Sequence, residues 1–133
     1  MILGVGTDLC DIRRIEQALT RFGDRFTARC FTAEERASAD KRANPAARYA
    51  MFYAAKEACA KALGTGFRQG VFWRDIQVYS LPSGQPMIRL QGGARNRLGA
   101  LAPANGNPRI DVSLTDEYPM AHAMVVISAA SDG

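Results

Sequence analysis

One alanine-rich segment, residues 45–64, constrains the fold of this chain more than any other feature. Nearly all of its residues are apolar or alanine, so a helix formed there would be largely buried. Asn44 and Pro45 supply a helix N-cap and a first-turn proline, and Gly64 supplies a helix end, so we expect one long buried helix. The segment also carries Arg48, Lys56, Glu57 and Lys61. Because charges on a buried helix need partners, these four residues are the first candidates for a functional site.

Two carboxylates are candidates for such chemistry. Tyr53, Glu57 and Lys61 recur every four residues and therefore share one stripe of the helix. An ordinary Glu–Lys helix pair explains this spacing, but the apolar surroundings favour a functional role. Asp8 follows the apolar residues 1–7, which are typical of a buried strand, so it either caps the next helix or binds a cation. If Asp8 and Glu57 met, they would form an oxygen-only site suited to Mg²⁺, with phosphates and waters as the remaining ligands.

The rest of the chain groups its helices early and its hairpins late. We expect helices beginning at Asp11, at Thr32 and near Gly93, and strands over 76–81, 87–90, 110–114 and 121–127. The first helix turns Ile12, Ile15, Leu19 and Phe22 inward, and residues 116–119 form the last turn. This order predicts an α+β fold rather than alternating βαβ units. Residues 1–133 contain no linker, so we expect a single domain.

Composition narrows the function classes. A formal net charge of +4 over 133 residues favours an acidic partner without choosing its class. No uncharged apolar run approaches the ~18–20 residues that span a bilayer, and Asp8 and Asp11 interrupt the N-terminus before a signal-peptide core can develop. We therefore expect a cytosolic protein. Cys10, Cys30 and Cys59 lack any C-x-x-C spacing, which indicates buried apolar residues rather than a disulfide framework or zinc site.

Four motifs occur in order along the chain. They are Gly4-Val5-Gly6-Thr7-Asp8, Arg13-Arg14-Ile15, residues 53–66 (YAAKEACAKALGTG) and residues 111–116 (DVSLTD). Together they resemble the 4′-phosphopantetheinyl transferases, specifically the short holo-acyl-carrier-protein synthase type. The most specific element is an aromatic-x-x-Lys-Glu-x-x-x-Lys helix followed by Gly-Thr-Gly, matched here with Tyr53 where Phe or Trp is more usual.

The resemblance implies a fold and an activity. The fold is a small antiparallel sheet packed on a long central helix. The activity is Mg²⁺-dependent transfer of the 4′-phosphopantetheine arm of coenzyme A to a serine of an apo acyl carrier protein, which releases adenosine 3′,5′-bisphosphate. The resemblance further implies a role in fatty acid biosynthesis, a branch of lipid metabolism, in the cytoplasm. Larger relatives fuse two halves around one site, and this chain has the length of one half, so a homotrimer with sites between subunits is implied.

The motif match implies that Asp8 and Glu57 hold Mg²⁺ against the pyrophosphate of coenzyme A. It also implies that Glu57 and Lys61 are the catalytic residues, with Lys61 near the same phosphates. The serine proton leaves to Glu57 or to a water on the metal. The residues matched to coenzyme A binding are Lys56, Lys61, Gly64, Thr65, Gly66, Ser83, Gly84 and Pro86. The Gly-Thr-Gly segment either presents N–H groups to a phosphate, or closes the helix, or does both.

The chain departs from the family pattern at three positions. Phe52 stands where many relatives have Arg, and Arg48, one turn earlier, either replaces that arginine or is a surface residue. Gln85 stands where the Gly-Lys-Pro turn near coenzyme A has its lysine. Asp111 stands where many relatives have His. Three interpretations are open for its side chain: it faces water, it accepts a hydrogen bond from a basic side chain, or it acts as a base. His122, the only histidine, does not match the family position, and we interpret it as structural.

The first helical region is basic. Arg14, Arg21 and Arg25 recur at intervals of seven and four, which places them on one face if the helix is continuous. That face is either simply solvated or, by the resemblance, the docking surface for an acidic acyl carrier protein. The alternative function is a small basic nucleic-acid-binding domain, which the arginines favour, although Phe67 and Trp73 are not interleaved with them. A purely structural trimeric adaptor leaves the charged helix unexplained.

Overall fold

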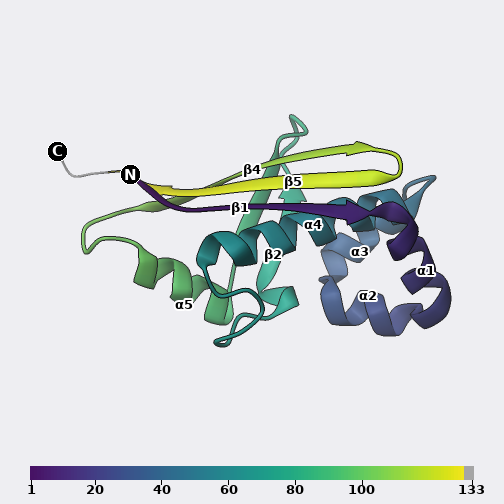
Figure 1. The fold of residues 1–133 in the computed structure, drawn as a ribbon, viewed down its shortest axis with the longest axis horizontal. Coiled ribbons are helices and arrows are strands. Elements are labelled where there is room, and N and C mark those ends of the chain that lie inside the picture. The colour runs from purple at the N-terminus through teal and green to yellow at the C-terminus, as the bar shows by residue number, and fades with distance from the viewer. Residues whose placement is uncertain (131–133) are drawn as a thin grey trace.

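The long helix expected over 45–64 is the centre of the structure (Figure 1). The computed structural model describes residues 1–130, and in it α4 (Pro45–Leu63) packs against one face of a three-stranded antiparallel sheet. The strands lie in the order β1 (Ile2–Asp11), β5 (Met120–Ala129), β4 (Pro108–Glu117). The α+β prediction is confirmed. No helix within residues 1–130 is long and apolar enough to cross a membrane.

Small residues bring this helix unusually close to the sheet. Its start and end match the sequence signals, with Pro45 in the first turn and Gly64 closing the helix at a φ of 79°. A Cβ at Gly4 would overlap the carbonyl oxygen of Ala62, and a Cβ at Gly6 would overlap that of Ala58. The glycines of β1 are therefore required for contact between strand and helix, and this contact brings the middle of α4 beside Asp8.

The remaining elements surround α4. They are α1 (Ile12–Phe22), α2 (Asp24–Cys30), α3 (Ala33–Asp40), the turn η1 (Trp73–Asp75), the hairpin of β2 (Ile76–Ser80) and β3 (Pro86–Leu90), and α5 (Gly92–Leu101). Figure 1 shows α1 to α3 gathered at one end of the molecule and α5 at the other. Asp11 caps α1, and Thr32 with Glu35 forms the expected capping box of α3.

Three local expectations are wrong. Asp8 lies inside β1, opposite Ala123 of β5, rather than at the end of a strand, so it caps no helix. The arginine-bearing region is not one helix, because Gly23, at a φ of 54°, ends α1 and begins α2. Phe22 does not face inward and is 45% exposed, since the break at Gly23 turns the chain before that position can reach the core.

The two faces of the three-stranded sheet differ in character. Toward α4, β5 buries Ala121, Ala123, Val125 and Ile127 completely. On the opposite face Val5, Leu9 and Met124 are 50%, 64% and 41% exposed. Antiparallel sheets commonly leave one face to water, but that face is then polar. An exposed apolar sheet face is typical of a surface that binds another protein.

Candidate functional site

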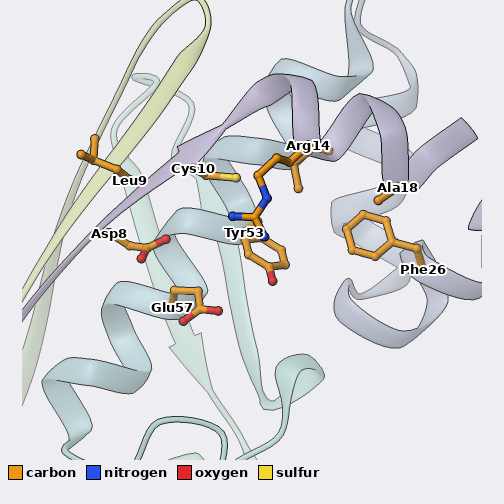
Figure 2. Close-up of a pocket in the computed structure, with 9 residues that line it drawn as sticks. Asp8, Leu9, Cys10, Arg14, Ala18, Phe26, Tyr53 and Glu57 are labelled. Carbon is orange, nitrogen blue, oxygen red and sulfur yellow. The ribbon is translucent and has the colours of Figure 1, made fainter. Parts of the chain in front are cut away.

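A pocket of about 270 Å³ opens where β1 passes into α1 beside α4 (Figure 2). Its lining comes from segments far apart in the sequence: Asp8, Leu9, Cys10, Arg14, Ile15, Ala18, Phe26, Tyr53 and Glu57. Figure 2 shows the carboxylates of Asp8 and Glu57 pointing into the same space, with the side chains of Arg14 and Tyr53 beside them. The structure thus brings together the two carboxylates that the sequence could only suggest as partners.

The electrostatics of this carboxylate pair favour a cation. The pKa of Glu57 lies above its ordinary value, first because the side chain is partly buried and second because Asp8 is negatively charged nearby. Lys61 acts in the opposite direction and only partly offsets these effects. A divalent cation between the two carboxylates would remove their mutual repulsion.

The donor set fits a hard cation with few protein ligands. Carboxylate oxygens are the ligands that Mg²⁺ prefers, and this ion commonly uses one or two of them together with waters and substrate phosphates. Within residues 1–130, no group of three or more His, Cys, Asp or Glu side chains is arranged to hold a metal ion. The pair Asp8 and Glu57 therefore suits a metal shared with a ligand better than a closed structural metal site.

Lys61 forms an ion pair with Asp8 and not with Glu57. Its Nζ donates to Asp8 Oδ1 at 3.1 Å and to the carbonyl oxygen of Thr7 at 2.9 Å. The Lys61 side chain is 52% exposed, whereas that of Asp8 is 17% exposed. The four-residue spacing of Glu57 and Lys61 therefore does not produce an ordinary Glu–Lys ion pair along the helix. An exposed ammonium with a third N–H lies beside the carboxylate pair and is free to donate to a ligand.

Lys56 does not reach the pocket, although we predicted that it binds coenzyme A. Its side chain is completely buried, pairs with Glu35 at 2.7 Å and donates to the carbonyl oxygens of Trp73 and Ile76. Burial lowers its pKa, and the charge of Glu35 opposes that shift. An ammonium enclosed in this way cannot contact a ligand, so the prediction of a direct contact is wrong. The position of Lys56 on α4 directs its side chain toward α3 and η1 instead.

The segment Gly64-Thr65-Gly66 serves as a helix cap. The N–H of Gly64 donates to the Lys61 carbonyl, and those of Thr65 and Gly66 both donate to the carbonyl of Ala60. The Thr65 side chain is buried, and its hydroxyl donates to the Gly66 carbonyl at 2.9 Å. These N–H groups are already used, so the prediction that they cradle a phosphate is wrong, while the alternative of a glycine C-cap is confirmed.

The hairpin turn predicted to bind coenzyme A lies away from this pocket within one copy of the chain. Gly84 and Pro86 line a separate groove beside Arg42 and Arg48, on the other side of α4. Ser83 accepts from the N–H of Gln85 within the turn. The structure therefore places these residues in a different hollow from Asp8 and Glu57.

The three arginines of the expected docking face lie around two adjoining hollows, although the helix that was expected to carry them is broken. Arg14 lines the pocket, and Arg25 lines an adjoining depression of about 450 Å³ whose wall also includes Phe26 and Tyr53. The Arg21 guanidinium lies over the Phe22 ring at 5.2 Å from its centroid. Sequence reasoning missed Phe26, which joins the two hollows, because no local pattern distinguishes it from a core residue.

The departures from the family pattern have distinct environments. Asp111 accepts from Arg109 at 3.0 to 3.1 Å, and its side chain is 47% exposed, so it both accepts from a basic side chain and faces water. His122 lies in β5 opposite Leu9 of β1 and Thr115 of β4. Phe52 is buried in the core, and the Arg48 guanidinium lies over its ring.

Comparisons with known proteins agree on one family. The family model of the 4′-phosphopantetheinyl transferase superfamily matches residues 4–121. A holo-[acyl-carrier-protein] synthase of Methylobacterium sp. (strain 4-46) is 62% identical over 132 residues, which is 99% of this chain and 98% of that protein. The enzyme of the same name from Azorhizobium caulinodans is 60% identical over 129 residues, 97% of this chain and 95% of that protein.

Solved structures give the same result for the fold. The crystal structure of holo-[acyl-carrier-protein] synthase from Neisseria meningitidis is similar with a TM-score of 0.85 and 33% identity, covering 96% of this chain and 99% of that one. The Helicobacter pylori synthase, solved in complex with coenzyme A, is similar with a TM-score of 0.79 and 28% identity, covering 93% and 99%. The small sheet packed on a long central helix is therefore a known architecture.

Proposed function

Because the chain belongs to the 4′-phosphopantetheinyl transferase superfamily, we propose that it transfers the 4′-phosphopantetheine arm of coenzyme A to a serine of an apo acyl carrier protein. The products are the holo acyl carrier protein and adenosine 3′,5′-bisphosphate. The observation that carries the proposal is that Asp8 and Glu57 line one pocket while Lys61 is bonded to Asp8. The whole chain, residues 1–133, acts as one such domain, in the cytoplasm and in fatty acid biosynthesis.

The proposed cofactor is Mg²⁺, held by Asp8 and Glu57. The support is chemical: both are carboxylates, they face the same space, and burial together with the charge of Asp8 raises the pKa of Glu57. A Mg²⁺ ion held by these two residues would supply neutralisation of charge on the pyrophosphate of coenzyme A. The protein's own part is to hold two anionic oxygens in place, which β1 and α4 do as rigid elements.

Lys61 and Glu57 have separate tasks in this reaction. The exposed ammonium of Lys61, kept beside the pocket by Asp8 and the Thr7 carbonyl, donates to a phosphate oxygen as negative charge moves to the leaving group. The serine oxygen attacks the phosphorus that bears the pantetheine arm, and the bond to adenosine bisphosphate breaks. Asp8 is already paired with Lys61. We therefore assign the carboxylate of Glu57 as the group on this chain that takes the serine proton.

The proposed protein substrate is recognised through Arg14, Arg21 and Arg25. Arg14 lines the pocket itself, and Arg25 lines the hollow beside it. An acidic carrier protein bound on α1 and α2 would thus lie next to the carboxylate pair, where its serine has to enter. Rim charges of this kind act mainly on the association rate and lose their effect as ionic strength rises.

The proposed assembly is a homotrimer with each site between two subunits. Two observations support association: the apolar sheet face around Val5, Leu9 and Met124, and the separation of the Ser83, Gly84 and Pro86 turn from the carboxylate pair. We propose that a second copy packs on that face and contributes its hairpin to the pocket of the first. The number three follows from similarity to the short type of the family.

Incubation with apo acyl carrier protein, coenzyme A and Mg²⁺, followed by intact mass measurement of the carrier, tests the proposal. We expect a gain equal to one phosphopantetheine, no gain when the metal is chelated, and restoration by added Mg²⁺. A carrier of unchanged mass, together with retention of the protein on heparin, would instead favour a nucleic-acid-binding domain.

A further inference from the structure

Tyr53 lines both hollows of the site. It contributes to the wall of the pocket that contains Asp8 and Glu57, and to the wall of the adjoining depression beside Arg25. Figure 2 shows the ring of Tyr53 near the carboxylate of Glu57, with the hydroxyl directed into the same space. A polar group of α4 therefore lies where the carboxylate pocket meets the face proposed to dock the carrier protein.

The ring of Tyr53 is held by aromatic neighbours. Its centroid lies 4.6 Å from that of Trp73 in η1 and 6.3 Å from that of Phe26 in α2. Trp73 is stacked in turn on Phe67, with centroids 3.9 Å apart and an interplanar angle of 14°. Because the ring is packed between elements of the core, the direction of its hydroxyl is set before a substrate arrives.

The hydroxyl of Tyr53 is not used by the fold. One turn earlier on α4, the hydroxyl of Tyr49 donates to Asp40 at 2.8 Å. That of Tyr53 has no hydrogen-bond partner within residues 1–130. Burial and, second, the charge of Glu57 raise the pKa of Tyr53 to about 12, so the phenol keeps its proton at neutral pH. A protonated donor thus faces the pocket beside the proposed base.

The position of Tyr53 on α4 places it on the carrier side of Glu57. Tyr53, Glu57 and Lys61 follow one another at steps of one turn, about 6 Å each, along one stripe of the helix. Lys61, at one end, is bonded to Asp8 and is the proposed donor to a phosphate. Tyr53, at the other end, packs on Phe26 of α2. A serine that enters from α1 and α2 therefore meets Tyr53 first and Glu57 second.

An attacking hydroxyl needs its proton and its lone pairs directed separately. The proton must point at the base, and one lone pair must point at the phosphorus atom. A serine oxygen has two lone pairs, so the second one can accept a hydrogen bond. A contact to Glu57 alone leaves the hydroxyl free to swing about that contact. A neutral donor on its other side fixes the orientation and leaves the removal of the proton to the carboxylate.

We propose that the Tyr53 hydroxyl donates a hydrogen bond to the attacking serine oxygen of the carrier protein while Glu57 takes the serine proton. This inference rests on the proposed function and adds a catalytic residue to it. The serine oxygen bonds to phosphorus, and the bond from phosphorus to adenosine bisphosphate breaks, its electron pair leaving with the bisphosphate oxygen. The phenol keeps its own proton throughout. Because Phe or Trp is more usual at this position, the contact assists the reaction in this chain and is not a requirement of it.

Kinetics of Tyr53→Phe tests the proposal, since this variant loses one oxygen and keeps the aromatic packing. We expect kcat/KM for the apo carrier protein to fall about 3- to 10-fold, the range of one neutral hydrogen bond, while KM for coenzyme A stays unchanged. Tyr49→Phe is the matched control, because it removes the same atom from the same helix at a hydroxyl that does not line the pocket. It should lower stability and leave kcat/KM unchanged.

A binding experiment assigns the contact to the serine without depending on transfer. Carrier proteins with serine and with alanine at the acceptor position are titrated by calorimetry into protein saturated with Mg²⁺ and adenosine 3′,5′-bisphosphate. The parent should bind the serine form more tightly than the alanine form. Tyr53→Phe should reduce this preference by about 3- to 10-fold, whereas Tyr49→Phe should retain it.

Three results would overturn the inference while leaving the proposed function intact. One is a parent-like kcat/KM in Tyr53→Phe. Another is an equal loss of affinity for the serine and alanine carriers, which would place the hydroxyl against a different part of the carrier. The third is a raised KM for coenzyme A in Tyr53→Phe, which would assign the hydroxyl to that substrate. A parent protein that leaves the mass of the carrier unchanged would instead overturn the proposed function, and this inference with it.

Discussion

Two lysines of α4, five residues apart, each pair with a carboxylate from another element, and the environments of the two pairs are opposite. Lys56 and Glu35 are 2.7 Å apart, and neither side chain is exposed. Lys61 and Asp8 are 3.1 Å apart, and Lys61 is 52% exposed. The chemistry of the partners is the same in both pairs. What differs is whether the donors and acceptors are already used, and that difference separates a structural ion pair from a functional one.

The buried pair is saturated with protein contacts. Besides the ion pair, Lys56 donates to two backbone carbonyls of the segment around η1, and Glu35 accepts from the N–H groups of Thr32 and Val78. The pair thereby joins α3, α4 and β2. The exposed pair has donors and acceptors left over, which a ligand can use. The same residue types therefore hold the fold together at one position and face a substrate at the next.

The largest effect should come from breaking the buried pair. Glu35→Gln keeps one acceptor oxygen, so one of the two backbone donors loses its acceptor, and Lys56 is left as a buried charge without a counter-ion. We expect a loss of about 3–5 kcal/mol in the free energy of unfolding, measured with urea. The double variant Glu35→Gln/Lys56→Met should lose less than Glu35→Gln alone, because the uncompensated charge is gone. A Glu35→Gln protein within about 1 kcal/mol of the parent would contradict the comparison.

Removal of an anionic oxygen from the exposed site should act on turnover instead. Asp8→Asn and Glu57→Gln each preserve side-chain volume, so we expect the midpoint of thermal unfolding to stay close to that of the parent. Transfer should fall by about 100-fold or more, and added Mg²⁺ should restore little of it. Glu117→Gln, at the exposed end of β4, is the control and should keep full activity. Parent-like transfer by either site variant at limiting Mg²⁺ would remove that residue from the metal site.

Lys61→Met sharpens the contrast with Lys56. The side chain is half exposed, so its removal should hardly change stability. If the ammonium acts mainly as charge moves to the leaving group, kcat falls by about 10- to 100-fold while KM for coenzyme A changes little. Steady-state kinetics with coenzyme A as the varied substrate separates the two parameters. A higher KM at unchanged kcat would make Lys61 a binding residue only.

The smallest expected effect is a gain in stability. Burial and the charge of Asp8 raise the pKa of Glu57 above its ordinary value of 4.5. The folded protein therefore holds this proton more tightly than the unfolded chain does, and stability is lost as pH rises through the raised pKa. Glu57→Gln should thus unfold slightly above the parent at about pH 7 in the presence of a chelator, and level with it near pH 4. A variant that unfolds below the parent at neutral pH would mean that ionised Glu57 is stabilised by a contact not described above.

Local signals made much of the fold predictable. The proline and glycine that bound α4, and the Thr32–Glu35 capping box, act within one helical turn, so the sequence contains everything that determines them. The break at Gly23 was not predicted, because arginines at intervals of seven and four fit a continuous helix. A glycine inside a helix costs only about 1 kcal/mol, which is too little to mark a break with certainty.

The site was predictable only in part. The resemblance to a known family indicated Asp8, Glu57 and Lys61, and the pocket contains the two carboxylates with Lys61 bonded to Asp8. The side chain of Lys56 was misassigned because its partner, Glu35, is brought to it by the packing of α3 on α4. Spacing along one helix specifies which residues share a face, but tertiary contacts decide which charge is buried.

Calorimetric titration of Mg²⁺ into the protein with coenzyme A present tests directly whether Asp8 and Glu57 form the metal site. We predict that Mg²⁺ binds the parent protein more tightly when coenzyme A is bound, because the pyrophosphate supplies ligands that the protein lacks. Asp8→Asn and Glu57→Gln should each lose this coenzyme A-dependent binding, whereas Glu35→Gln should keep it at a temperature where it is folded. Equal Mg²⁺ affinity in the parent and in Glu57→Gln would contradict the assignment of these two carboxylates as the metal site.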